Sequence, residues 1–418
     1  MREPVTEQTI AHNRRLAKEH PATGLPELAR SLLLFGWQID QDQPSLRIPY
    51  FEEGATVYRS LVAEGAEEHL RAAAHAISSL GRQYSLAHAD ELSLAARHEA
   101  AELSRRANLR RESTKAETRL LMELGYGLAE AGQFAQAVAV QRGVIAIYRA
   151  METAGGHAWR NVITWALLDL AIYLDLAGQT GASLEIEREA LALERRMTHH
   201  APDRLAGLAM WTAGASLRFA GLGHHQDARG LMEEAIHACE RLPAEGGRSS
   251  FTFGYQALQA ALFARSGTAD EQTPTGRTPP IGVDPEQPRQ PVPGLSFHHW
   301  AYSARQSYRA GYEAINEAIA ATADPPPDDP HGLAELGTLL RRRNIRASVL
   351  FDRDWAQFLE TITPALRQSV EVERRLRAIA PGRGPQRLIR ALTDQALCHL
   401  VTGSNAMAAG ALRQAHRL

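Results

Sequence analysis

The sequence has little of several kinds of residue, and each shortage excludes a class of protein. Only two cysteines occur, Cys239 and Cys398, and each stands alone in a stretch of helical pattern, so we expect neither a disulfide framework nor a metal cluster. Lysine occurs only at Lys18 and Lys115, and the formal net charge of −2 gives no electrostatic basis for binding nucleic acid or an acidic membrane. No apolar run approaches the ~20 residues that cross a bilayer, and no apolar secretion segment stands near the N-terminus. These shortages predict a protein of the reducing cytoplasm.

The chain does contain a repeated pattern of small residues, large residues and glycines. In the clearest copy Gly125 is followed by Leu128, Gly132 and Ala137. The first positions of six copies are residues 36, 81, 125, 171, 216 and 260, so the copies are spaced by 45, 44, 46, 45 and 44 residues. A period this steady indicates stacked structural repeats, which also explains how 418 residues form a core without splitting into ordinary globular domains.

Each copy has the pattern of two amphipathic helices joined by a tight turn. Apolar residues recur at helical spacing on both sides of the turn, and the composition is rich in Ala, Leu, Glu and Arg. Gly132, Gly178, Gly223 and Gly403 fall where the first helix must end, and glycine permits the left-handed conformation of such a cap. We therefore predict an all-α fold: an α-α superhelix of about eight helix pairs, in which each pair touches only its neighbours.

These residues resemble the tetratricopeptide repeat. The resemblance is carried by ELGYGLAEAGQFAQAVAVQRGVIAIY and by RRLAKEHPATGLPELARSLLLFG. The period near 45 is similar to the long-helix variety found in kinesin light chains and in bacterial arrays attached to signalling NTPases. It covers residues 12–266 well and 331–418 loosely, with Ile48 and Val144 in place of the usual small residues. The resemblance implies a concave face, lined by the first helices, that binds other proteins.

The period also predicts how the chain is divided. Residues 1–266 hold repeats one to five and the first helix of repeat six, at about 251–266. Residues 267–295 are rich in Pro and Gly and poor in large apolar residues, so we expect a disordered insertion. Residues 296–418 then supply the second helix of repeat six and degenerate C-terminal repeats.

No pattern in the sequence favours catalysis. GRGPQR at 382–387 lacks the strand and the Lys-Ser/Thr pair of a phosphate loop. Adjacent histidines, as at 199–200, 224–225 and 298–299, point about 100° apart on a helix and rarely hold one metal. Glu123, Asp169 and Asp175 could supply carboxylates for acid–base work, but we interpret them as solvated or ion-paired helix residues. We therefore predict no catalytic, cofactor or metal site.

Binding is the better-supported function. Applied to the first helices, the repeat template predicts a groove that is basic and aromatic at its N-terminal part and apolar in the middle, around Leu168 and Ile172. The predicted partner-binding residues are Arg30, Trp37, His75, Arg82, Arg119, Tyr126 and Trp165.

Arginine binds carboxylates bidentately, and aromatic side chains give contact area at low entropic cost. The groove would thus suit an acidic peptide or a C-terminal carboxylate. Arg30, Arg82 and Arg119 are expected to converge about 10 Å apart per repeat. Glu123 and Glu130 are the acids that could neutralise part of this charge.

We therefore predict a non-catalytic scaffold that binds a partner protein or peptide in the concave groove. The alternative is a ligand- or peptide-sensing regulator of a signalling or transcriptional pathway, although residues 1–25 are too few for a helix-turn-helix. An all-α enzyme is the third hypothesis. Neither a nucleic-acid nor a membrane partner is predicted.

Overall fold

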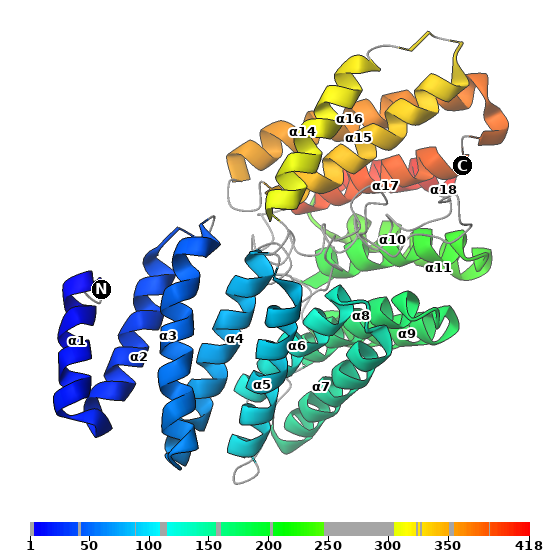
Figure 1. Ribbon diagram of the computed structural model, residues 1–418. Helices are drawn as coiled ribbons and strands as arrows, with labels where there is room; N and C mark the ends of the chain where they lie inside the picture. Colours follow the sequence, from blue (N-terminus) through cyan, green and yellow to red (C-terminus); the bar gives the residue numbers. More distant parts are fainter. Residues whose placement is uncertain are drawn as a thin grey trace. The chain divides into compact units, whose positions relative to one another are not determined.

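A computed structural model describes eleven stretches of the chain (Figure 1). These are residues 4–40, 43–87, 89–108, 115–155, 160–200, 204–245, 305–322, 325–326, 328–350, 355–383 and 385–418. The chain divides into two compact units, Met1–Trp159 and Arg160–Leu418, and each is treated by itself. In the described stretches the regular structure is entirely helical, which confirms the all-α fold class. The predicted helix at 251–266 and the predicted insertion at 267–295 lie outside them.

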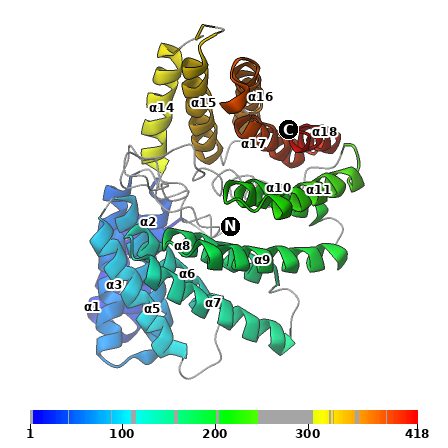
Figure 2. The same ribbon diagram turned by 90° about the vertical axis from the view of Figure 1, so that its right-hand side faces the viewer.

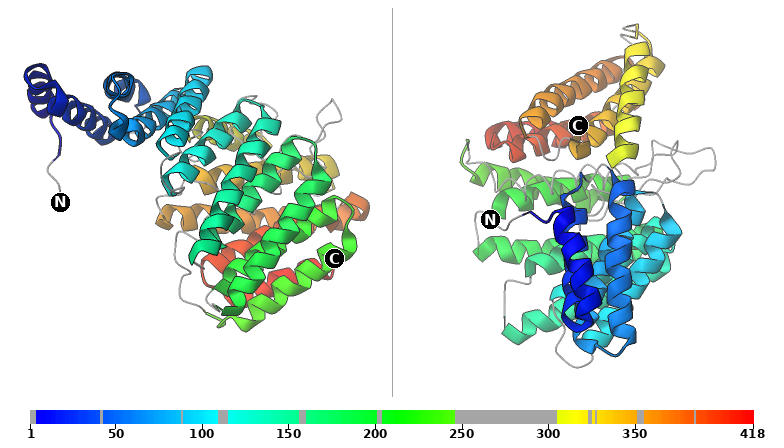
Figure 3. Two further views of the ribbon diagram at one scale, coloured as in Figure 1. Left: turned by 90° about the horizontal axis from the view of Figure 1, so that it is seen from below. Right: turned by 60° about the vertical axis from the view of Figure 1, so that its left-hand side comes forward.

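The first unit is a row of helices that pack in chain order, each on the next (Figures 1 and 3). They are α1 (Glu7–Glu19), α2 (Pro21–Gln38), α3 (Pro44–Ala63), α4 (Leu70–Leu86), α5 (Asp90–Asn108), α6 (Lys115–Glu130) and α7 (Phe134–Gly155). Helix α1, which the repeat pattern did not predict, buries Ile10 and Ala17 against α2 and leaves its other side polar. A polar outer helix of this kind covers the apolar end of a repeat stack.

The second unit contains two runs of helices that each pack in chain order (Figure 2). The first run is α8 (Arg160–Leu176), α9 (Thr180–His200), α10 (Leu205–Gly221) and α11 (His225–Arg241). The second is α14 (Arg305–Ala321), α15 (Pro330–Leu350), α16 (Trp355–Ile379), α17 (Pro385–Val401) and α18 (Asn405–His416).

The turns between paired helices form as predicted. Gly132, Gly178, Gly223 and Gly403 have φ values of +73°, +74°, +84° and +78°, so all four adopt the left-handed conformation. The amide after each glycine donates back to a carbonyl in the last turn of the helix, as from Gln179 to Leu174 at 2.8 Å. These bonds satisfy carbonyls that the helix end would otherwise leave unpaired.

The small residues of the pattern bring the two helices of a pair together. Ser183 Oγ donates to the Ala171 carbonyl at 2.5 Å, and Ser216 Oγ donates to the Ala228 carbonyl at 2.7 Å. Both bonds join residues twelve apart, so the same two template positions meet in successive repeats. A Cβ atom on Gly81 would lie 3.2 Å from the Ser93 carbonyl oxygen, so the same two template positions approach closely two repeats before Ala171 and Ser183.

The expectation that each pair touches only its neighbours is wrong in the second unit. The C-terminal pair packs on α10 and α11, with α17 against α10 and α18 against α11 (Figures 1 and 2). More than a hundred residues of sequence separate the two pairs. The pattern of small residues specifies contacts within a pair, whereas this contact depends on the side chains at the ends of two stacks.

No helix in the described stretches is long and apolar enough to cross a membrane.

Candidate functional site: an aromatic and basic face on α2, α4 and α6

The predicted binding residues occupy two rows of the repeat template. Trp37, Arg82 and Tyr126 each follow the first template position, and Arg30, His75, Arg119 and Trp165 each stand six residues before it. On one helix the two rows are seven residues apart, which is close to two turns, so they lie on the same side. The structure shows that burial differs greatly along each row.

Trp37 is the exposed aromatic residue of this face. Its side chain is 40% exposed and meets the ring of Phe51 edge-on, with centroids 5.0 Å apart. The guanidinium carbons of Arg47 and Arg82 lie 5.4 Å and 5.5 Å from its ring centroid. Arg47 is itself held by the Ile39 carbonyl, to which Nη2 donates at 2.7 Å. Trp37 is therefore fixed by its neighbours while part of its ring faces solvent.

Arg82 is half-buried on α4 and pairs with Glu123 on α6, Nη2 to Oε1 at 3.0 Å. Glu123 is 5% exposed and also accepts hydrogen bonds from the Ser78 hydroxyl and from Arg119 Nε, the latter at 3.3 Å. Burial lowers the pKa of Arg82, the Glu123 charge opposes that shift, and the Arg119 charge adds to it. The predicted convergence of Arg82 and Arg119 is therefore neutralised in part by a carboxylate that both share.

Helix α2 presents an apolar and a basic residue beside Trp37. Arg30 is exposed and pairs with Glu27 of the same helix at 3.4 Å. Leu34 is 39% exposed and stands four residues after Arg30 and three before Trp37, so the three side chains share one side of the helix. Sequence reasoning missed Leu34, although its i, i+4 spacing from Arg30 was available.

His75 on α4 is exposed, and Arg119 on α6 has a side chain that is 59% exposed. Desolvation lowers the pKa of His75, the positive charge of Arg119 lowers it further, and Glu123 opposes both effects. We call this surface the α2–α4–α6 face. It consists of Arg30, Leu34, Trp37, His75, Arg82 and Arg119.

Two predicted binding residues lie elsewhere. Tyr126 is 1% exposed and has the Arg97 guanidinium 5.4 Å from its ring centroid, so a partner cannot reach it in this structure. Trp165 belongs to the second unit, where it is half-buried and meets Trp211 edge-on at 5.4 Å. Ile172, in the predicted apolar middle, is also buried.

The acids that we considered for catalysis have structural partners or are buried. Asp175 on α8 and Glu187 on α9 both pair with Arg218 on α10, at 2.6 Å and 3.0 Å. Burial raises the pKa of both acids, and the Arg218 charge opposes the shift. The interpretation as solvated or ion-paired residues is confirmed for Glu123 and Asp175, which are ion-paired, whereas Asp169 is buried and not solvated.

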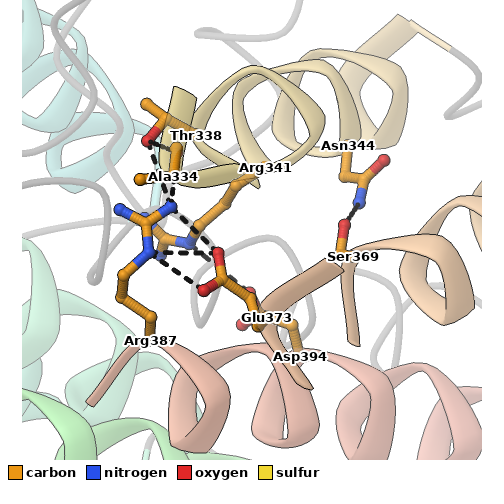
Figure 4. A network of polar contacts seen from close by, with 8 residues as sticks. All are labelled: Ala334, Thr338, Arg341, Asn344, Ser369, Glu373, Arg387 and Asp394. Atoms are coloured by element: carbon orange, nitrogen blue, oxygen red, sulfur yellow. Dashed lines mark hydrogen bonds and ion pairs between the residues drawn. The ribbon is translucent and has the colours of Figure 1, made fainter. Parts of the chain in front are cut away.

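The GRGPQR segment supplies a structural arginine (Figure 4). Arg387 Nε donates to Glu373 on α16 at 2.9 Å, and its Nη2 donates to the Ala334 carbonyl on α15 at 2.8 Å (Figure 4). Beside it Arg341 pairs with Asp394 at 3.5 Å. These bonds join α15, α16 and α17 to one another, and Arg387 is committed to that junction.

The histidine pairs lie on the surface where the structure describes them. His199, His224 and His225 are exposed, and His298 and His299 lie outside the described stretches. Among the residues that the structure describes, no group of three or more His, Cys, Asp or Glu side chains is arranged to hold a metal ion. Cys239 and Cys398 are both free and buried.

Comparisons with known proteins do not assign the chain to a family. No family description matches it, and no curated protein matches it. One similar solved structure is described as a circular tandem repeat protein with novel repeat topology and enhanced subunit contact surfaces. The two are 13% identical over 98% of this chain and 95% of that one, with a TM-score of 0.27. A TM-score this low does not establish a shared fold. The description of the chain as an α-α helical repeat array therefore rests on its own helix pairs and turns.

Proposed function

We propose that this chain is a non-catalytic scaffold for protein–protein interaction, and that its partner docks on the α2–α4–α6 face. The observation that supports this most is the state of Trp37, which is held by Phe51, Arg47 and Arg82 yet 40% exposed. A fixed aromatic side chain loses little entropy when a partner covers it, and tryptophan is enriched among the residues that dominate binding energy.

The face combines apolar and positive groups. Leu34 and Trp37 offer adjoining apolar area, and Arg30 and Arg119 offer exposed guanidinium groups beside it. Guanidinium groups bind carboxylates through charge-assisted hydrogen bonds. We therefore propose as partner a protein segment that carries an aliphatic or aromatic side chain flanked by acidic residues.

We also propose that the helix pairs are tetratricopeptide-like. Support comes from the turn glycines and from the hydroxyl bonds that join template positions twelve apart, as between Ser183 and Ala171. In such arrays first helices carry the binding surface, and α2, α4 and α6 are the first helices of three consecutive pairs.

The test compares two double variants as baits in native lysate. The site variant is Trp37→Ala with Arg119→Glu. The control variant is Leu92→Ala with Arg105→Glu, which changes an exposed leucine and an exposed arginine on the second helix α5. Each captured chain is then purified and its affinity for wild type and both variants is measured by calorimetry at two salt concentrations.

We expect the site variant to lose at least about tenfold in affinity, with a weaker salt dependence, and the control to bind as wild type does. The unfolding midpoint of the control should match wild type, and that of the site variant should fall, because Trp37 packs on Phe51 and Arg119 pairs with Glu123. The affinities are therefore compared at a temperature at which both variants are fully folded. A partner that binds the site variant normally but not the control would place the interaction on the second helices and contradict the proposal.

A further inference from the structure

Neighbouring pairs in the second unit meet in a parallel arrangement. On the outer surfaces of the second helices, Arg188 of α9 pairs with Asp227 of α11 at 2.7 Å, and Arg195 pairs with Glu234 at 2.6 Å. Both partners advance by seven residues from one bond to the next, so α9 and α11 run in the same direction. This is the contact produced by repeating one pair along a stack.

The contact between α11 and α18 runs the other way. Near the start of α18, Asn405 Nδ2 donates to the Pro243 carbonyl, just beyond the end of α11, at 2.8 Å. Near the end of α18, His416 Nε2 lies 3.2 Å from Glu233 Oε1, inside α11. Residue numbers rise on one helix as they fall on the other, so α11 and α18 are antiparallel.

Two further bonds support this arrangement. Arg413 Nη1 pairs with Glu240 Oε1 at 2.6 Å, and the Ala406 amide donates to the Ala244 carbonyl at 3.2 Å. Apart from Asn405, the side chains that the two helices bury are small or apolar. Buried residues of α11 are Ala228, Leu231, Met232, Ala235, Ile236, Ala238 and Cys239, and those of α18 are Asn405, Ala408, Ala409, Leu412 and Ala415.

The symmetry of this seam is that of a dimer interface. First helix meets first helix, α10 on α17, and second meets second, α11 on α18. An antiparallel meeting of equivalent helices follows from a rotation of about half a turn, as in a self-complementary interface, and not from the translation that builds a stack. The seam thus joins the last helix pair of the stack α8–α11 to the last helix pair of the stack α15–α18.

We propose that this seam also forms between two copies of the chain, with the α14–α18 block of each copy docked on α10–α11 of the other. The block packs in chain order on its own, and α10–α11 pack on α8–α9 without it. The 59 residues from 246 to 304 join the two sides in sequence. The seam makes the same contacts within one chain and between two chains, so either form satisfies the same side chains. This proposal uses a different surface from the α2–α4–α6 face.

Mixing two charge-reversed variants tests the exchange. One variant carries Glu233→Arg and Glu240→Arg on α11, and the other carries Arg413→Glu and His416→Glu on α18. By itself, each variant places like charges across the seam. This holds when the seam forms within one chain (the closed form) and when it forms between two chains (the exchanged form). In the mixture, an exchanged heterodimer holds one chain of each variant and has opposite charges at both seams. One seam carries the reversed charge pairs and the other carries the native pairs. The chains are unfolded together in urea, refolded by dilution and weighed by native mass spectrometry.

We expect the ratio of heterodimer to homodimers to exceed its statistical value by about tenfold, because two seams regain attractive pairs that both homotypic forms lack. The control is one chain with all four substitutions, which should recover the unfolding midpoint of wild type. Two separate monomer populations in the mixture, each as destabilised as alone, would show that the seam closes only within one chain and would overturn the proposal. Failure of the four-fold variant to recover would show that these charges do not face each other, which overturns it as well.

Discussion

The guanidinium of Arg218 on α10 pairs with Glu187 on α9 at 3.0 Å, and both side chains are buried. The same guanidinium pairs with Asp175 at 2.6 Å, and its Nη2 also donates to Ser183 Oγ at 2.6 Å. One buried cation thus pairs with one buried and one half-buried carboxylate. Stability should depend on how the protonation of these groups changes with pH.

Arg218→Met should destabilise the second unit strongly at neutral pH, by about 3–5 kcal/mol, because it leaves the buried Glu187 and the half-buried Asp175 without their cation. The loss should shrink on acidification, since both carboxyl groups then take up protons. Urea unfolding at pH 7.5 and pH 5 measures this. Arg195→Met, which removes an exposed pair with Glu234, is the control and should cost under about 1 kcal/mol at both pH values. Equal losses for Arg218→Met at the two pH values would contradict the charge argument.

Glu187→Gln should act in the opposite direction. Burial raises the pKa of Glu187 above its ordinary value of 4.5, so the folded chain binds this proton more tightly than the unfolded chain does. The resulting stability is fully present below the pKa of Glu187 in the unfolded chain, and it is lost as the pH rises through the pKa of Glu187 in the folded chain. Glutamine has no charge to desolvate, and Arg218 keeps Asp175. The variant should therefore gain about 1 kcal/mol over wild type at pH 8, and less near pH 4. A gain that grows in acid would show that the sign is wrong.

Ala137→Leu should overpack the contact between α6 and α7 and cost about 1–3 kcal/mol, because Ala137 is fully buried at a template position reserved for small residues. Ala139→Leu is the matched control, since Ala139 is exposed on the same helix two residues away. Thermal unfolding of the two variants measures the difference. Equal midpoints would mean that the repeat register assigned to α7 is incorrect.

Gly337→Ala should destabilise the junction in Figure 4, although alanine is the better helix former. The added Cβ would clash with Glu373 Oε1 and lie 2.9 Å from Arg387 Nη2, so the pair that joins α16 to α17 must shift. Gly230→Ala on α11 meets nothing within 4 Å and should stabilise by about 0.5–1 kcal/mol. Denaturant midpoints that move in the same direction for both variants would contradict the steric account.

The repeat period and the turns could be predicted from the sequence because both depend on short-range chemistry. Gly178 ends α8 in the left-handed conformation, and Ser183 reaches the Ala171 carbonyl, because these residues are close in sequence and follow helix geometry. The disordered insertion predicted at 267–295 stays a prediction, since that stretch lies outside the described residues.

Tertiary structure decided which template positions are accessible and which charges meet. Trp37 and Tyr126 occupy the same template position, yet one is 40% exposed and the other 1%, because Arg97 covers the second ring. Arg82 on α4 reaches Glu123 on α6 through a contact between helices, whereas Arg119 and Glu123 are an i, i+4 pair within α6 that the sequence already indicated. The antiparallel contact between α11 and α18 was likewise decided by tertiary structure. It depends on two stack ends that are far apart in sequence, so a period of about 45 residues could specify the pairs but not which two of them would meet.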